Sequence, residues 1–579
     1  MENSMRMCLI IRWFMICLVA TIPWQFSNPI EAAPTAEQTR ELNDIKKSAG
    51  RVAGLVKKKQ TAEARQLVEQ QEDRLGALKD AALTEPAFLS AAAQVGTARQ
   101  SVPIEFVATQ VPDLSTDGPP YVVRIAYLIP ENREPSPAVP QRAATLLTWY
   151  QRWYADQMQR HGFGNRTFQY ETRTGGSWPI VHVAKLARTD SFYRCDDVQG
   201  DIGGHMNRIL DGAVDAGVSV GKDGEVWWLF VEMQEQQPDG SFKGTERIGG
   251  LGKVASLSGR TVCDAGTLAV INLDSLSNDR PYDGLSVPEL GPYPLRFGKS
   301  FKPTRGKTVS EVASSNAGSW MHEIGHSFGL FHDYRNDDNF AGNLMGNGLR
   351  GFRGWALPKK YPKDYSRLTH NDAQVLNLSR YFREPQKYTD NEGPRIKQAV
   401  IDGTVEAGLL TCRFSATDDT ELAYACLVYD DSVVGTASLS GTSVESNIRF
   451  ERYKPGDARW VLHLYDAAGN MRLMPGNSTV SKPQNQAPQP FVACQIDTVK
   501  VGQPLTLDAS ATVDPDNDKS ELRFAWDVDG DGEFEVADSK NPTLIAKYPK
   551  AGFYRVSARV TDPSGASAVS NPIAIEVRP

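Results

Sequence analysis

The chain has 579 residues, of which 40% are hydrophobic and 23% are charged, close to the averages of soluble globular proteins. These values exclude a fibrous or largely disordered protein and, at roughly 150 residues per domain, predict several domains. With 70 acidic and 63 basic side chains, the formal net charge of -7 provides no basic surface for a nucleic-acid partner.

Residues 1–33 read as a secretory signal peptide. Two arginines precede the apolar stretch 13–22, and the small residues Ala32 and Ala33 follow it, which is the order of charged, apolar and cleavage regions in such leaders. The alternative is an uncleaved anchor, but the stretch is short for a membrane span of roughly 20 residues. We therefore expect a secreted or cell-envelope protein that is not inserted in a membrane once the leader is removed.

Export would place the remaining cysteines in an oxidising compartment, where disulfides can form. Two of the seven cysteines lie in the leader, which leaves an odd number in the mature chain. Cys412 with Cys426 and Cys195 with Cys263 are candidate disulfide pairs, although spacing alone does not decide the connectivity. The alternative is that some of them are small buried apolar residues.

Residues 34–116 are predicted to form a helical N-terminal segment, because apolar residues between Leu42 and Leu78 recur at helical spacing. One interpretation is a pro-segment that shields the following domain or helps it to fold. The other is a helical extension or an oligomerisation stalk. The sequence leaves both interpretations open.

Residues 117–386 alternate between strand and helix patterns and are predicted to form one domain. The strand patterns cover 121–129, 167–172, 178–184 and 226–231, and the helical patterns cover 146–158, 206–214, 310–330 and 369–382. The run from Val226 to Val231 is continuously apolar, as in a strand buried on both faces. This order predicts an α+β fold, in which helices pack on a mixed sheet.

Beyond residue 386 short alternating strands dominate and predict two all-β modules. Strand patterns at 422–429, 446–453 and 460–465, with turn-rich boundaries, predict an immunoglobulin-like or fibronectin III-like sandwich over 387–482. A polar linker with two prolines then leads to a second sandwich over 483–579.

Residues 322–333 read His-Glu-Ile-Gly-His-Ser-Phe-Gly-Leu-Phe-His-Asp and carry three of the eight histidines. On a helix, His322 and His326 project from the same face, so both imidazoles can reach one metal ion. Gly329 can end the helix with dihedral angles that other residues resist, which lets His332 supply a third nitrogen. Three neutral ligands leave a fourth position open, as in catalytic rather than structural zinc sites.

Simpler interpretations of this motif are three hydrogen-bonded histidines on an ordinary helix, or a metal site without catalysis. Glu323 argues against the second, because a carboxylate beside the first ligand can act as a general base. In that mechanism zinc lowers the pKa of its bound water to about 7 and polarises the scissile carbonyl. Glu323 takes the proton and passes it to the departing amine.

The motif resembles the extended signature of the metzincin zinc peptidases. The matching positions are His322, Glu323, His326, Gly329 and His332. The segment 343–346 is similar to the tight turn whose methionine, here Met345, lies beneath the metal, and Asp333 is similar to a residue of the adamalysin-like branch. The resemblance implies a zincin-like catalytic domain, supporting roles for Gly329, Asp333 and Met345, and a secreted zinc metalloendopeptidase that acts on protein or peptide substrates.

An extended substrate is expected to lie along an exposed sheet edge upstream of the motif. The candidates for this edge are residues 252–258 and 267–273. The alternative is that they form an ordinary loop and a core strand.

The last module resembles a PKD domain, an immunoglobulin-like sandwich, over residues 487–578. The resemblance rests on the segments 505–510, 514–516, 524–532 and 552–556. Asp527, Asp529 and Asp531, at alternate positions, are candidate calcium ligands, and the alternative is that they serve as turn residues. The glutamate that an EF-hand has at its twelfth loop position is missing.

The two sandwiches are candidate attachment modules for an extracellular polymer or a cell-surface ligand. A second function class therefore stays open, an adhesion or polymer-binding protein in which the metal site is vestigial. The two classes differ in whether Glu323 is needed for activity.

Overall fold

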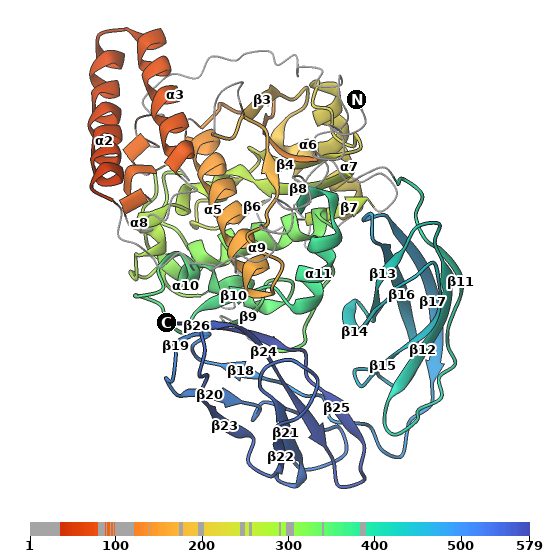
Figure 1. Ribbon diagram of the computed structural model, residues 1–579. Coiled ribbons are helices and arrows are strands. Elements are labelled where there is room, and N and C mark those ends of the chain that lie inside the picture. Colours follow the sequence, from red (N-terminus) through yellow and green to blue (C-terminus); the bar gives the residue numbers. More distant parts are fainter. Residues whose placement is uncertain are drawn as a thin grey trace, which may run out of the picture.

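The computed structural model describes residues 35–78, 121–136, 138–172, 178–194, 202–243, 249–253, 258–288, 291–296, 306–337, 341–382 and 390–579, with some residues between 87 and 98. A mixed α/β region is followed by an all-β region of several sheets, as the sequence predicts (Figure 1). The predicted leader lies outside the described residues. Across the described part of the chain, no helix combines the length and apolar character needed to cross a membrane.

The predicted N-terminal helices form an antiparallel pair, α2 (Ala36–Lys57) and α3 (Thr61–Leu78) (Figure 1). A capping box starts α2, in which Thr35 and Gln38 bond each other's backbone N–H groups. The buried faces of both helices belong to the same contiguous core as the central sheet. Phe88, which also belongs to the N-terminal segment, has its ring centre 4.9 Å from the guanidinium group of Arg152 in the α/β region. The segment is therefore packed into the α/β region.

The central sheet is mixed, with strand order β2-β1-β4-β8-β7 and β3 also paired with β1. Its strands are β1 (Val122–Ile129), β2 (Gln169–Tyr170), β3 (Val181–Lys185), β4 (Glu225–Val231), β7 (Gly249–Lys253) and β8 (Ser258–Asp264). All pairs are parallel except β7 with β8, which is antiparallel and leaves β7 at an edge. Every residue of β4 is buried, as its continuous apolar run predicts.

Helices cover both faces of this sheet. Alternate residues of β4, such as Trp228 and Phe230, pack with α5 (Ala138–Arg160) and α9 (Val309–Ser327). Their neighbours Trp227 and Leu229 face α7 (Ile202–Asp215) on the other side. The helix predicted around the histidine motif is thus a buried layer of the core.

Short elements complete the α/β region. They are α6 (Asp190–Tyr193), η1 (Ala265–Val270), α8 (Leu273–Leu276), η3 (Asn347–Gly351), α10 (Phe352–Ala356), α11 (His370–Leu378), η4 (Arg380–Phe382), and the strand pairs β5 (Glu235–Gln236) with β6 (Phe242–Lys243) and β9 (Ala341–Asn343) with β10 (Tyr365–Arg367). The predicted capping box at Thr369 and Asp372 starts α11. The predicted helix is nevertheless too long, because Ser379 is extended and ends α11 at Leu378.

The extended segment predicted at 267–273 is wrong. The Asp264 carboxylate accepts a hydrogen bond of 2.8 Å from the Gly266 N–H group and starts the helical turn η1 there. Of the two candidate substrate edges, only the one that includes Gly252 and Lys253 lies on a strand, β7.

The first all-β module is a sandwich of two sheets, ordered β11-β12-β15 and β14-β13-β16-β17. Its strands are β11 (Arg395–Ile401), β12 (Leu410–Thr417), β13 (Leu422–Tyr429), β14 (Ser432–Ser438), β15 (Ser443–Phe450), β16 (Gly456–Asp466) and β17 (Met471–Val480). One face of β13 packs in the sandwich core, whereas Tyr424, Cys426 and Val428 on the other face join the core of the α/β region. Strand β13 is therefore buried on both sides, and the sandwich is docked on the α/β region.

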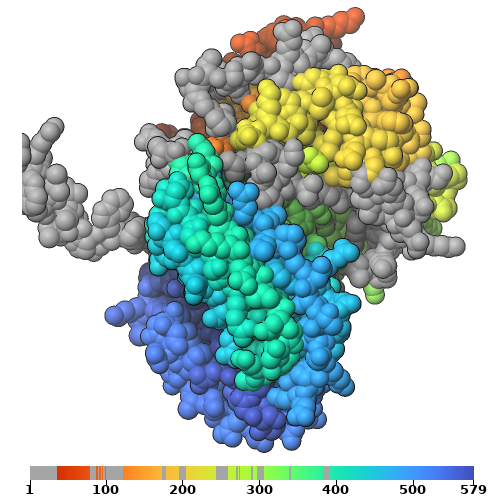
Figure 2. Space-filling model, turned by 90° about the vertical axis from the view of Figure 1, so that its right-hand side faces the viewer, coloured from red at the N-terminus to blue at the C-terminus, as the bar shows by residue number. Residues whose placement is uncertain are grey.

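The C-terminal module is a second sandwich, with sheets β18-β20-β23 and β19-β26-β24-β21-β22, where β25 also pairs with β24. Its elements are β18 (Ala493–Cys494), β19 (Thr498–Lys500), β20 (Leu505–Asp508), η6 (Lys519–Glu521), β21 (Arg523–Asp527), β22 (Val536–Ser539), β23 (Thr543–Ala546), β24 (Gly552–Thr561), β25 (Ser567–Val569) and β26 (Ile573–Arg578). Figure 2 shows the first sandwich in front, with this module below it.

Asp497 links the C-terminal module to the α/β region. Its carboxylate lies 3.4 Å from Arg160 on α5 and 3.1 Å from Arg367 on β10. Burial alone would raise the pKa of Asp497, but the two guanidinium groups lower it to about 2. The carboxylate is therefore charged at neutral pH, and both sandwiches contact the α/β region.

The predicted disulfide pairs are wrong. Cys263, Cys412, Cys426 and Cys494 are buried free thiols. Cys412 faces the core of the first sandwich, whereas Cys426 faces the α/β region, so their side chains diverge. Cys263 accepts a hydrogen bond from the Trp228 indole at 3.1 Å, and Cys195 lies outside the described residues.

Candidate metal centre

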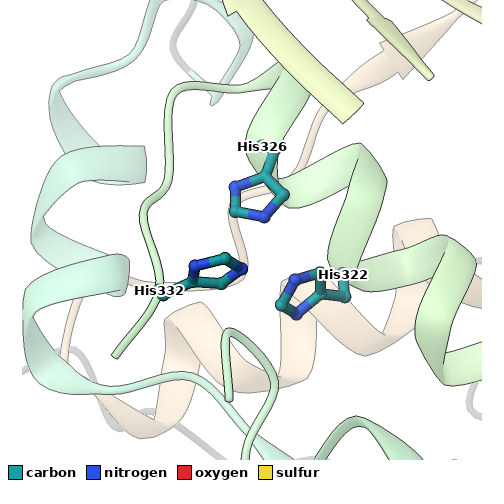
Figure 3. Close-up of side chains that lie close together, drawn as sticks. All are labelled: His322, His326 and His332. Carbon is teal, nitrogen blue, oxygen red and sulfur yellow. The ribbon is translucent and has the colours of Figure 1, made fainter. Parts of the chain in front are cut away.

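Three imidazoles converge at the C-terminal end of α9, as Figure 3 shows. His322 and His326 lie one turn apart on the helix, and Gly329, with a φ of 91°, turns the chain so that His332 returns toward them. The ring centroids are separated by 4.6, 4.9 and 5.3 Å, and one ligand nitrogen from each ring lies within 4.8 Å of the other two. The predicted cluster is therefore assembled.

Each of these rings has its Nδ1 atom engaged by an oxygen acceptor. Nδ1 of His322 donates to the Leu344 carbonyl at 2.7 Å, and Nδ1 of His326 donates to the Leu330 carbonyl at 2.8 Å. Nδ1 of His332 donates to the Asp431 carboxylate at 3.0 Å. Because these oxygens accept hydrogen bonds, the proton of each neutral ring lies on Nδ1 and the lone pair on Nε2. Three Nε2 atoms are thus left for one metal ion.

Burial keeps the two helical histidines neutral. It lowers the pKa of His322 to about 3, and the neighbouring imidazole of His326 lowers it further. Burial likewise lowers the pKa of His326 to about 4. Both rings therefore offer an unprotonated nitrogen at neutral pH, which metal coordination requires.

Met345 lies against the helix between His322 and His326. It is fully buried in the turn predicted at 343–346, and the carbonyl of the preceding Leu344 is the one that orients His322. Gly325 leaves the space for its sulfur, because a β-carbon at this position would lie 2.7 Å from Sδ of Met345. The turn thus orients His322 through a hydrogen bond and supports the helix through packing.

Gly325→Ala tests this contact. In an unobstructed helix, alanine stabilises by roughly 0.5–1 kcal/mol relative to glycine, whereas a collision in a packed core costs about 1–3 kcal/mol. We therefore expect Gly325→Ala to lower the free energy of unfolding in urea. Gly54→Ala is the matched control in α2, where an added β-carbon has no neighbour within 4 Å. Equal stabilisation by both substitutions would contradict the assigned packing.

Asp333 lies beside the cluster as a fully buried carboxylate. Arg335 binds it through two side-chain bonds, of 2.9 and 2.7 Å, and the backbone N–H of Asp333 donates to the Met345 carbonyl at 3.0 Å. Asp333 therefore connects the loop of the third histidine to the turn beneath the first. The sequence analysis missed Arg335, although its position two residues after a motif aspartate was a signal for an ion pair.

Glu323 follows the first histidine on α9, and its side chain is half-buried. Strand β8 fixes this point of the helix, because the Thr261 hydroxyl donates to the Glu323 carbonyl at 3.0 Å. Burial raises the pKa of the nearby Cys263 thiol, and the negative charge of Glu323 raises it further. The thiol therefore stays protonated at neutral pH.

The acidic loop of the C-terminal module is also assembled. Asp527, Asp529 and Asp531 lie together with Glu535, which the sequence analysis missed, and their carboxylate oxygens are within 4.8 Å of one another. Acidic residues continue at alternate positions through Glu533 to Glu535, which was the available signal, but only Glu535 joins the cluster. Within the loop, Asp527 accepts hydrogen bonds from the N–H groups of Gly530 and Gly532.

Comparisons with known proteins identify the C-terminal module. Residues 485–577 match the family model described as PKD domain. This module is a PKD domain. No curated protein matches the chain.

Solved structures that match the chain include two of OgpA from Akkermansia muciniphila. A catalytically inactive form in complex with an O-glycopeptide substrate is 14% identical, with 65% of this chain and 97% of that chain covered and a TM-score of 0.41. The wild type is 15% identical, with the same coverage and TM-score. Fibronectin III-like modules of CbhA from Clostridium thermocellum are 17% identical over 32% of this chain and 93% of theirs, with a TM-score of 0.14.

Proposed function

We propose that the protein is a secreted zinc-dependent endopeptidase of the metzincin type. The observation that carries the proposal is the set of three imidazoles whose Nδ1 atoms are all held by oxygen acceptors, so that three Nε2 atoms face one point. Three neutral nitrogen ligands and no fourth protein ligand in the described cluster are the donor set of a catalytic zinc site.

Zinc held by these histidines would supply Lewis-acid chemistry, which polarises a peptide carbonyl and makes a water molecule more acidic. Glu323 is the general base in this proposal, because it adjoins the first ligand on the same helix. It accepts the proton of the attacking water and returns it to the departing amine, so no covalent intermediate on the protein is needed.

The proposed substrate is a protein or peptide that binds in extended form along β7. This strand is one edge of the sheet, runs antiparallel to its neighbour and packs near α9. An edge strand offers unpaired backbone groups, and an added substrate strand can bond them. Strand β7 ends at Lys253 and therefore precedes the histidine motif in the chain, as the sequence analysis expects of the substrate edge.

The PKD domain and the first sandwich are proposed to attach the enzyme to an extracellular polymer or a cell surface. Asp527, Asp529, Asp531 and Glu535 are proposed to bind calcium, since hard carboxylate oxygens at this spacing suit that ion. Zinc is the catalytic ion in this proposal, and calcium would act on the stability of the PKD loop.

Metal removal tests the proposed function. The purified full chain is expected to bind zinc stoichiometrically and to cleave a denatured protein substrate. A chelator should abolish cleavage, and added zinc should restore it because the histidines are held in place by backbone and carboxylate acceptors without the ion. Cleavage that persists after zinc has been removed would exclude the proposal.

A further inference from the structure

The first sandwich reaches the histidine cluster with the tip of one hairpin. Strands β13 and β14 are joined by the two-residue turn Asp430-Asp431, in which both residues have positive φ, 48° and 68°. Such a turn matches the twist of the two strands and holds its second residue in a defined direction. Asp431 is thereby directed at His332, a residue 99 positions earlier in the chain.

Three hydrogen bonds join this tip to the loop of the third histidine. Nδ1 of His332 donates to Asp431, and its carbonyl accepts from the Val433 N–H group at 2.8 Å. The N–H group of Tyr334 donates to the Ser432 hydroxyl at 3.3 Å. Backbone and side chain of His332 are thus both held by the sandwich.

Packing beneath the hairpin fixes its position. Val433 belongs to the core of the α/β region, and Phe331 lies on His463 of β16 with ring centroids 3.9 Å apart. The Tyr424 hydroxyl donates to Asn371 of α11 at 3.2 Å. The contact at Asp431, whose side chain is 84% exposed, therefore lies at the solvent-facing end of a packed interface, and Phe331 and Val433 tie the loop of His332 to the sandwich beneath it.

We propose that the β13–β14 hairpin is a part of the metal centre, in which Asp431 is the positioning residue of His332. This inference rests on the proposed function only in that the three histidines bind zinc. His322 and His326 are oriented by carbonyls of their own domain, whereas the third ligand takes its acceptor from the sandwich. A carboxylate acceptor also makes the imidazole a stronger donor to the metal. The sandwich is accordingly required for zinc affinity and is more than an attachment module.

Asp431→Gly tests the proposal in the full chain. It removes the carboxylate and leaves Asp-Gly, a preferred pair for this turn, so the hairpin keeps its conformation. Zinc affinity, measured by competition with a chelator, is expected to fall by roughly 10–100-fold. The absorption spectrum of the cobalt-substituted protein should change as well, because the geometry of the third ligand relaxes. Asp431→Asn keeps an acceptor but has no charge. Its zinc affinity should lie between those of the wild type and Asp431→Gly.

Asp430→Asn is the matched control. Asp430 occupies the other turn position and lies 3.3 Å from Lys454, away from the histidines. The Asp430→Asn variant should bind zinc as tightly as the wild type. The metal-free forms of all variants should unfold at similar temperatures. If Asp431→Gly binds zinc as tightly as Asp430→Asn, the proposed role of Asp431 is wrong.

The outcomes separate this inference from the proposed function. A wild type that binds zinc but cleaves no protein would overturn the peptidase proposal, while weaker zinc binding by Asp431→Gly would still support the positioning role. An active wild type with unchanged zinc affinity in Asp431→Gly would overturn the positioning role alone. A wild type that binds no zinc would overturn both.

Discussion

Glu323→Gln is expected to lower the rate of substrate cleavage by about 10²–10⁴-fold, the range that a positioned general base contributes. The amide is nearly isosteric with the carboxylate but does not accept a proton from water at neutral pH. Zinc content should stay unchanged, because the ligands in this proposal are the three histidines and each has its own acceptor. The measurements are the cleavage rate of a denatured protein and the metal content of the same sample.

Glu311→Gln is the control for this substitution on the same helix. Glu311 closes the capping box of α9 with Thr308, and glutamine serves in that box as well. Its cleavage rate should remain close to that of the wild type. Comparable cleavage by Glu323→Gln and the wild type, at equal zinc content, would exclude Glu323 as the general base. Absence of cleavage by both would favour the adhesion protein with a vestigial metal site.

Local periodicity predicted the elements that place two of the three histidines. The i, i+4 spacing of His322 and His326 and the glycine after them are properties of one helix and its end, so they can be read without knowledge of the fold. The strands β1, β4 and β13 were likewise predicted, because each is a long apolar run of β-forming residues.

Acceptors from distant segments were not predictable in this way. Asp431 meets His332 only because the sandwich docks on the α/β region, which no local pattern records. One signal was nevertheless present. Residues 422–429 are almost continuously apolar, and the rule that assigned two-sided burial to β4 applies equally to β13. Applied there, it would have predicted that this sandwich sheet is covered by a neighbouring domain.

A side chain that bonds a nearby backbone N–H group explains why the prediction of an extended segment at 267–273 was wrong. Asp264 binds the Gly266 N–H group and ends β8, so the apolar residues that follow form a helical turn and not a strand. In the same way, Cys412 and Cys426 were predicted to pair, but the sequence does not tell which face of a sheet each side chain takes. The disulfide prediction failed on that point.

Arg335→Met is expected to lower the free energy of unfolding by about 3–5 kcal/mol, the usual cost of leaving one member of a buried ion pair without its partner. Asp333 is fully buried, and Arg335 supplies both of its charged hydrogen bonds. Burial raises the pKa of the nearby Asp372 to about 7, and the charge of Asp333 raises it further. Denaturation in urea, followed by tryptophan fluorescence, measures the loss.

Two further variants distinguish the loss of a buried pair from a general effect of removing arginine. Arg395→Met removes an exposed guanidinium group that lies 3.9 Å from the exposed Glu392, and such surface pairs contribute about 0–1 kcal/mol. The double variant Asp333→Asn with Arg335→Met should regain part of the stability, because it buries no charge. If Arg335→Met lowers the free energy of unfolding no more than Arg395→Met does, Asp333 is neutral or hydrated. Asp333 would then join the loop of His332 to the Met345 turn through its backbone N–H group alone.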